Sequence, residues 1–433
     1  MTDTLSGLRF SQRRRNMARY SRLAVALWAG IQLMSGSALP AGAADLPSYE
    51  LDTVIQLAIE RNPLMTEAQG LIDQTQGQQI AAGAYPNPTL YGQSGRGAIR
   101  DPSTGDSITE YAVSVGQPLE WPGKRAARQR AADAGFAGAG AGFSEKRLNL
   151  MAEVRIAFDE LLFAQRQAEL AEQNLGIVED VKRIVTTRVR LGEAPQFEAI
   201  KAQVEVLKAN QVVTRARNTV RVTRVALDTL TAGALGRTYA IKGDFRRVPG
   251  ELLLEELVAS MLKNHPSLNR LARQVERADY TVDFERQARV PNVTVGGGYW
   301  REIGREAVTA NLSVPVPIWY QQKGEIASAL GIRRQQEAEL LRMRNELLRA
   351  VNLHYQDAQT TADLIRVFEE GLLKQAEGAL RIAQFSFRQG ASSLLEVLDA
   401  QRVQRQILFD YTQARFDLSI SLTRLERSIG GSL

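Results

Sequence analysis

The chain has 433 residues, with 54 lysines and arginines, 48 aspartates and glutamates, and no cysteine, which excludes disulfides and thiolate metal sites. Six of the basic residues and one acidic residue fall in the first 43 positions. The remaining 48 basic and 47 acidic side chains nearly cancel, so the charge does not indicate nucleic-acid binding.

Residues 1–43 have the pattern of an export signal peptide. Arginines between Arg13 and Arg22 precede an apolar run, Leu23–Leu39, and small residues follow at Ala41-Gly42-Ala43. Polar residues interrupt the run, and it is shorter than the roughly 20 residues of a membrane-spanning helix, which disfavours an N-terminal anchor. We predict cleavage after Ala43. No later apolar run approaches this length, so a membrane crossing would require a closed β-barrel.

The rest of the chain is a tandem repeat with a spacing of about 200 residues, which indicates a doubled domain and not a solenoid. Each copy is predicted to contain a helix, two strands, a long helix, a tight turn and a returning helix. The paired blocks are Leu51–Pro63 with Leu254–Pro266, Pro86–Leu90 with Pro291–Val295, Val113–Leu119 with Leu312–Ile318, and Leu191–Gln203 with Gln389–Gln401.

The two repeats are predicted at 44–232 and 251–433, joined by a Gly-rich and charged linker or girdle segment at 233–250. The first repeat is predicted to have strands near 89–99 and 108–118, a long helix near 124–191 and a return helix near 196–231. The second is predicted to have strands near 293–301 and 306–316, a long helix near 323–388 and a return helix near 393–428.

The strand segments alternate between apolar and small or polar residues with a period of two. Tyr111, Val113 and Val115, for example, share one face. Each segment has about 9 to 11 residues, the length of a tilted strand that crosses a bilayer. The pattern alone leaves open a pair of hairpins on a soluble protein. A barrel needs at least about eight strands, so several copies must contribute, and three would supply twelve.

The long helices are unusual for a globular protein. Lys124–Leu191 contains no proline and would extend about 100 Å at 1.5 Å per residue. Its apolar stripe is narrow and its polar faces are wide, which indicates helices packed side by side around water. The glycines between Gly135 and Gly142 lack the Lys-Ser/Thr ending of a phosphate-binding loop and are better explained by close helix packing.

The order of elements, the duplication and the motifs resemble the TolC family of outer-membrane efflux proteins across nearly all the mature chain. The motifs are Asn62-Pro63, His265-Pro266, Gln117–Arg125, Val316–Ile318, Arg188–Gly192, Phe387–Gly390 and Leu395–Ala400. The resemblance implies a homotrimer that is mainly α with a small β part. Its twelve strands would form one outer-membrane β-barrel and its long helices a periplasmic α-helical barrel.

The resemblance also implies partners and a site. The partners would be a periplasmic membrane-fusion adaptor, an inner-membrane pump and outer-membrane lipid, with no nucleic acid. The periplasmic tips that contact the adaptor would contain Arg188, Leu191 and Gly192 in the first repeat and Gln389 and Gly390 in the second. Ser392 stands where the family often has arginine two residues after the second tip glycine, so the contacts that close the tip are expected to differ.

Two carboxylates are predicted to line the channel entrance. Glu396 and Asp399 lie three residues apart on one helical face just past the second tip. Three copies would place six carboxylates in a ring that favours cations. The first repeat has Glu198 and Lys201 at the matching positions. Without the family context, two solvated helix charges would be the favoured explanation of both acids.

We therefore expect an outer-membrane exit duct of a tripartite efflux system and no enzyme, because no nucleophile, base and orienting residue group together. The joint Trp121–Arg125 resembles the CzcC-like heavy-metal branch. Multidrug efflux and type I protein secretion are alternatives, and a periplasmic coiled-coil adaptor is a further one. No cofactor or bound metal is expected, since two distant histidines, His265 and His354, form no zinc site.

Overall fold

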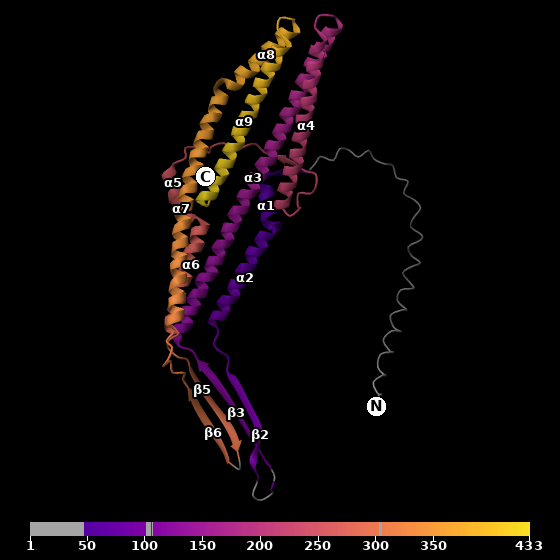
Figure 1. Ribbon diagram of the computed structural model, residues 1–433. Coiled ribbons are helices and arrows are strands. Elements are labelled where there is room, and N and C mark those ends of the chain that lie inside the picture. The colour runs from indigo at the N-terminus through magenta and orange to yellow at the C-terminus, as the bar shows by residue number, and fades with distance from the viewer. Residues whose placement is uncertain (1–46, 101–104, 106, 303–304) are drawn as a thin grey trace, which may run out of the picture. The chain divides into compact units, whose positions relative to one another are not determined.

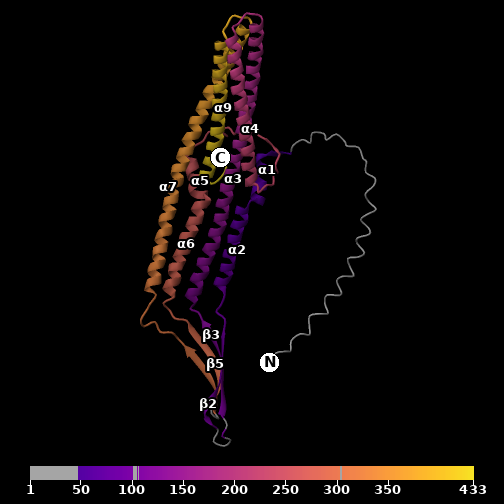
Figure 2. The ribbon, with the colours of Figure 1, turned by 45° about the vertical axis from the view of Figure 1, so that its right-hand side comes forward.

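The computed structural model describes residues 47–100, 105, 107–302 and 305–433. The predicted signal peptide lies outside the described residues. From residue 47 onward the chain forms one unit. In both views a small sheet lies at one end of the longest helix. The turns of two helical hairpins lie at the other end (Figure 1; Figure 2).

The two repeats contain corresponding elements in the same order, except that the long helix of the second repeat is divided into three segments. The first consists of β1 (Ser48–Glu50), α1 (Leu51–Arg61), α2 (Pro63–Gly83), β2 (Thr89–Arg100), β3 (Ser107–Leu119), α3 (Pro122–Arg190) and α4 (Gln196–Leu230). The second consists of β4 (Ala240–Lys242), α5 (Leu254–Asn264), α6 (Pro266–Gln287), β5 (Val293–Glu302), β6 (Arg305–Ser313), α7 (Lys323–Val367), η1 (Phe368–Leu372), α8 (Leu373–Arg388) and α9 (Leu394–Ile429).

A proline divides the first helical segment of each repeat at the same place. Asn62 and His265 precede prolines and adopt extended backbone angles, as expected before a ring that clashes with helical geometry. The Asn62 side chain caps the next helix by accepting from the Leu64 amide at 2.9 Å. The His265 ring likewise accepts from the Ser267 amide at 3.2 Å. His265 is therefore a helix cap.

The four longer strands form one antiparallel sheet in the order β2-β3-β5-β6. The pairing of β3 with β5, with Val113 opposite Tyr299, joins the two repeats. Strand β6 ends at Ser313, three residues short of the predicted end near 316. Pro315 and Pro317 explain the difference, because proline has no amide hydrogen to donate to a neighbouring strand.

Glycines in β5 allow the two repeats to approach closely. A Cβ on Gly298 would lie 2.8 Å from Ser114 Cβ and 2.9 Å from the Val113 carbonyl oxygen of β3. A Cβ on Gly296 would collide with the Asn311 side chain. The Gly297 position is less crowded, with the Thr309 carbonyl oxygen at 3.4 Å. The glycine run therefore sets the spacing at the junction between the repeats.

The helices form a layer in which α3 is central. Helix α3 contacts α2 and α6 over its sheet-proximal half and α4 and α9 toward the tips, while α7 contacts α6 and α9. The second long helix, predicted to be continuous over 323–388, is interrupted by the π-helical segment η1. There the buried Phe368 ring packs edge-on against Tyr411 at 6.0 Å, and Glu369 accepts a 2.9 Å hydrogen bond from the Tyr411 hydroxyl.

None of the described helices combines the length and the apolar character needed to cross a membrane.

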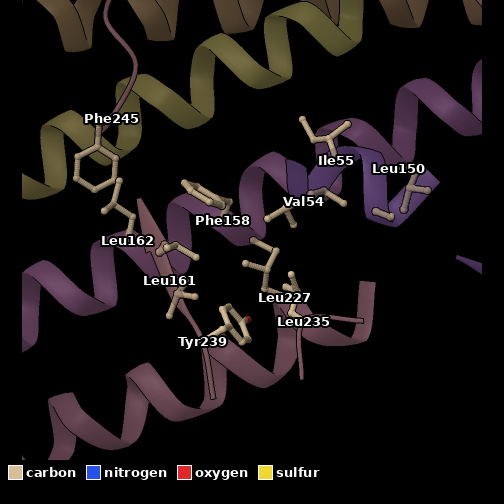
Figure 3. Close-up of a cluster of buried hydrophobic side chains, with 14 of the residues drawn as sticks. Val54, Ile55, Leu150, Phe158, Leu161, Leu162, Leu227, Leu235, Tyr239 and Phe245 are labelled. Atoms are coloured by element: carbon tan, nitrogen blue, oxygen red, sulfur yellow. The ribbon is translucent and has the colours of Figure 1, made fainter. Parts of the chain in front are cut away.

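The largest core cluster includes the linker between the repeats (Figure 3). Tyr239 is almost fully buried and donates a 2.7 Å hydrogen bond to the Arg224 carbonyl. Strand β4 pairs in parallel with β1, so that Ile241 lies opposite Tyr49. Phe158 of α3 packs in the same cluster. The segment 233–250 is therefore part of the folded core.

A buried charge cluster ties the linker to both repeats. Arg246 of the linker makes two hydrogen bonds, of 2.7 and 2.9 Å, to the Glu426 carboxylate of α9, which Arg155 of α3 also contacts. Burial opposes ionisation of Glu426, but these arginines prevail and lower its pKa. The Ser419 hydroxyl donates a 2.6 Å hydrogen bond to the Asp159 carboxylate, and burial raises the pKa of Asp159 to about 6.

The glycine spacing of β5 gives a first prediction. We expect Gly298→Ala to lower the free energy of unfolding by about 1–3 kcal/mol, because the added methyl overpacks the β3–β5 junction. Gly297→Ala is the matched control, because the same methyl meets only an ordinary contact there. Thermal unfolding of the purified protein measures both, and equal midpoints for the two variants would contradict this explanation.

Candidate functional site

Both helical hairpins turn through a left-handed glycine. Gly192 has φ of 77° and Gly390 has φ of 76°, values that favour glycine because it has no Cβ. In each turn the residue after the glycine donates its amide back to the long helix: Glu193 to the Arg188 carbonyl at 2.9 Å and Ala391 to the Ser386 carbonyl at 2.8 Å. This is the Schellman arrangement, which satisfies carbonyls at a helix end.

An apolar cluster joins the two hairpins just below these turns. Val181 and Val185 of α3 pack with Phe387, Leu394 and Val397 from the second hairpin. All five side chains are buried. The two tips of one chain are therefore packed against each other and are not independent hairpins.

Arg188 bridges the two tips. Its guanidinium lies over the ring of Phe387, with Cζ 5.5 Å from the ring centre, and its Nε lies 4.0 Å from Glu193. Cation–π contacts of this kind are attractive, more so when partly shielded from water. The predicted tip residue Arg188 thus contacts the opposite hairpin. Phe387 was not predicted as the partner of Arg188, although it is adjacent to Arg388 at the end of the second long helix.

The other predicted tip residues lie at the turns and face outward. Leu191 and Gln389 are the C-terminal caps of α3 and α8, and both are exposed. Their amides donate to Thr187 and Phe385 carbonyls, so the backbone of each cap is satisfied. An exposed leucine beside a rigid turn is available for contact with another protein.

Glu396 and Asp399 lie on the exposed side of α9 in its first turns. Ser393 caps this helix, with its hydroxyl accepting from the Glu396 amide at 3.4 Å. Asp399 makes an ion pair with Arg402, which the sequence-based prediction did not include although the i, i+3 spacing could have indicated it. Within the part of the chain that the structure describes, Glu396 forms no ion pair, so the two carboxylates differ in their immediate surroundings.

A buried polar pair connects the hairpins further from the tips. Gln401 donates a 2.7 Å hydrogen bond to Asn174, and both side chains are buried. Such a pair is costly to break, because each amide would be left without a partner away from water. Sequence analysis missed this contact, which joins residues 227 positions apart.

Within the described ranges, no group of three or more His, Asp or Glu side chains is placed to hold a metal ion. What the site offers is a set of exposed helix turns, a carboxylate-bearing helix face and helices whose outer edges are open. These features are those expected of one subunit of a larger assembly.

Comparison with known protein families identifies the same class of protein. The model of the family described as outer membrane efflux protein matches residues 54–233 and 257–431, which are the two repeats. The chain belongs to this family. It is an outer-membrane efflux channel protein of a tripartite system, with a periplasmic helical part, and it is not an enzyme.

Three curated proteins are similar over most of their length. The chain is 26% identical to the cobalt-zinc-cadmium resistance protein CzcC of Cupriavidus metallidurans, over 88% of this chain and 90% of CzcC. It is 23% identical to the pyoverdine export outer membrane protein OpmQ of Pseudomonas aeruginosa, over 88% and 84%. It is 23% identical to the nickel-cobalt-cadmium resistance protein NccC of Alcaligenes xylosoxydans xylosoxydans, over 73% and 71%.

Solved structures share the fold. The outer-membrane channel OprN superimposes with a TM-score of 0.76 at 16% identity, covering 88% of this chain and 90% of OprN. The outer membrane protein VceC of Vibrio cholerae gives a TM-score of 0.75 at 17% identity, covering 88% and 96%.

Contact between the tips gives a second prediction. We expect Arg188→Ala to loosen the junction by about 0.5–2 kcal/mol, because the cation–π contact with Phe387 is lost. Amide hydrogen exchange at 181–191 and 383–397 should then accelerate by roughly 2- to 30-fold. Arg190→Ala, an exposed neighbour on the same turn, is the control. Equal acceleration in both variants would show that Arg188 does not bridge the tips.

Proposed function

We propose that three copies of this chain assemble into the exit duct of an efflux pump that exports heavy-metal cations. The observation that carries the assembly is the open sheet: within the described residues β2 pairs only with β3, and β6 only with β5. Unpaired strand edges are not tolerated in a bilayer, so each edge needs a partner strand. Proteins of this family form trimers within tripartite systems, and three copies supply twelve strands.

The exposed apolar side chains on one face of the sheet support the proposal that this face contacts lipid. Val113, Val115 and Val308 are exposed in the single chain, and they alternate with smaller or polar neighbours along their strands. Leu90 and Leu312 are exposed as well. A wall with one apolar face and one mixed face suits a barrel with lipid outside and water inside.

The heavy-metal substrate is supported by similarity to CzcC and NccC, whose names specify cobalt, zinc, cadmium and nickel resistance. The joint Trp121–Arg125 resembles the heavy-metal branch and supports the same substrate class. Similarity to OpmQ, named for pyoverdine export, favours a second candidate, the export of organic molecules. Type I protein secretion is a further alternative within the same fold.

The exposed tips are the proposed contact with a periplasmic adaptor, which in turn engages an inner-membrane pump. Leu191, Gln389 and the turn glycines Gly192 and Gly390 present a surface held rigid by the apolar cluster beneath it. Arg188 takes part by fixing the two tips to each other and contributes less exposed surface.

Two measurements test the function. The native mass of the detergent-extracted protein should correspond to three copies, and a strain that lacks the protein should become sensitive to cobalt, zinc or cadmium. A monomeric mass would contradict the channel assembly. Unchanged metal sensitivity together with loss of siderophore or drug export would replace the heavy-metal substrate by the second candidate.

The proposed acidic ring gives a third prediction. Changing Glu396 and Asp399 together to Ala should reduce the preference of single channels for cations, because six carboxylates leave the entrance. Glu396→Ala alone should produce part of the change, because it removes one of the two carboxylates of each copy. Single-channel reversal potentials measure this selectivity.

The control for the ring is Glu377→Ala, which removes an exposed carboxylate from α8. It changes the net charge as much as Glu396→Ala alone does, but it lies outside the proposed ring. Selectivity unchanged by the double substitution, or changed as much by the control, would remove the ring from the proposal.

A further inference from the structure

The residue before the helix-dividing proline joins two helices in the first repeat. The side-chain oxygen of Asn62 accepts from the Leu64 amide at 2.9 Å, which caps α2. The side-chain nitrogen of Asn62 donates to the Leu230 carbonyl at 2.9 Å, at the end of α4. Leu230 lies three residues before Gly233, a left-handed glycine with φ of 82°. Asn62 is buried, so these two bonds fix the start of α2 to the end of α4 and form the first joint.

His265 makes the corresponding two contacts in the second repeat. Its Nδ1 accepts from the Ser267 amide at 3.2 Å, and its Nε2 lies 3.2 Å from the Arg427 carbonyl of α9. Arg427 lies three residues before Gly430, whose φ is also 82°. A backbone amide only donates and a carbonyl only accepts, so the neutral ring carries its proton on Nε2. In this second joint a histidine therefore has the structural role that an asparagine has in the first.

Only one of these two residues gains a proton near neutral pH. Asparagine does not titrate, whereas the ordinary pKa of histidine is about 6.5. A protonated imidazole carries hydrogen on both ring nitrogens, so Nδ1 of His265 would no longer accept from the Ser267 amide. Two donors would then face each other at the start of α6, where the helix dipole also disfavours a positive charge. Protonation of His265 therefore removes the cap of α6, while Asn62 keeps its own bonds.

A cavity of about 420 Å³ lies beside His265, between α3, α6, α7 and α9. Glu145 of α3 lines it and forms an ion pair with Arg270 of α6. Lys263, at the end of α5, is exposed. The other charged or titratable side chains that line the cavity are His354 of α7 and Arg424 and Arg427 of α9. A proton on His265 would thus add a positive charge beside two arginines, which favours the neutral ring in the closed joint.

The second histidine of the chain faces the same cavity but is held differently. Although far from His265 in sequence, His354 lines the cavity from α7. Its Nδ1 lies 3.6 Å from the carboxylate of Asp357, on the same helix. This contact does not connect two helices, so protonation of His354 is not expected to separate α6 from α9.

We propose that His265 makes the second joint open in acid, whereas Asn62 keeps the first joint closed. Opening separates the start of α6 from the end of α9. Since α9 runs from this joint to the second tip, acid frees the C-terminal end of the return helix in one repeat only. The two repeats thus differ in their response to pH through one pair of corresponding residues.

The direction of the pH dependence follows from the surroundings of the ring. Burial lowers the pKa of His265 below its ordinary value of 6.5, against the weaker opposing effects of the Arg427 carbonyl and Glu145. In the open joint the ring meets water and titrates near its ordinary pKa, so the open joint takes up the proton at a higher pH than the closed one. The joint is therefore fully stable above about pH 6.5 and weakens as the pH falls through the lower pKa of the closed joint.

Amide hydrogen exchange of the full-length protein in detergent, at pH 7.5 and pH 5.5, tests this proposal. The second joint is followed at residues 267–271 and 424–430, and the first joint, at 64–68 and 227–233, is the reference within the same molecules. Acid changes the intrinsic exchange of both sets alike, so the ratio of second-joint to first-joint exchange isolates opening. We expect this ratio to rise by roughly 3- to 10-fold at pH 5.5, since uptake of one proton gives at most about tenfold per pH unit.

The first repeat supplies the matched variants. His265→Asn places in the second joint the residue that closes the first, so the ratio should stay at its pH 7.5 value at both pH values. Asn62→His should transfer the acid sensitivity to residues 64–68 and 227–233. His354→Ala, which introduces the residue type found at the corresponding Ala157, should keep the pH dependence of the unaltered protein.

Each outcome decides the proposal. A ratio that does not change with pH in the unaltered protein overturns it, as does an unchanged acid response in His265→Asn or loss of that response in His354→Ala. If His265→Asn exchanges rapidly at both pH values because its joint does not close, the other two variants decide. Retention of the response in His354→Ala together with its gain in Asn62→His then supports the proposal, and absence of either one overturns it.

Discussion

The open edges of the four-stranded sheet are the constraint on which the rest of the molecule depends. Backbone amides and carbonyls of an edge strand need partners, and a bilayer offers no water to supply them. Duplication of the repeat brings β3 and β5 together but leaves β2 and β6 at the margins. The helical layer repeats this arrangement, with α4 and α8 at its margins. In the proposed assembly, identical copies added in one direction would supply partners for the margins of both layers.

A chain built from two repeats also needs a rigid junction between them, and the structure supplies one at several levels. Strand β3 pairs with β5, Asn174 bonds to Gln401, and Arg188 reaches Phe387. Between these, Arg246 carries the linker into a buried ion cluster around Glu426. Glu426 is buried, and loss of both arginines would leave its charge uncompensated, so this cluster helps to fix the linker to α3 and α9.

Much of this fold can be predicted from local sequence. Period-two alternation, helix-length polar faces and Asn-Pro or His-Pro breaks are properties of neighbouring residues, and their repetition identifies the duplication. The π-helical segment at Phe368 was not predictable in this way, because it depends on Tyr411, 43 residues away, and the contacts of Arg246 depend on still more distant partners. Within the site, the turn glycines were predictable and the Asp399–Arg402 pair was not considered. No residue pattern by itself reports which metal or organic molecule is exported.

The junction between the two hairpins of one copy combines apolar and polar contacts. A buried amide pair and a cation–π contact reinforce an apolar cluster, so separation of the hairpins would expose polar groups that lose their partners. Paired polar groups also fix the register of the hairpins more strictly than apolar contacts do. The paired hairpins of each copy should therefore move as a unit.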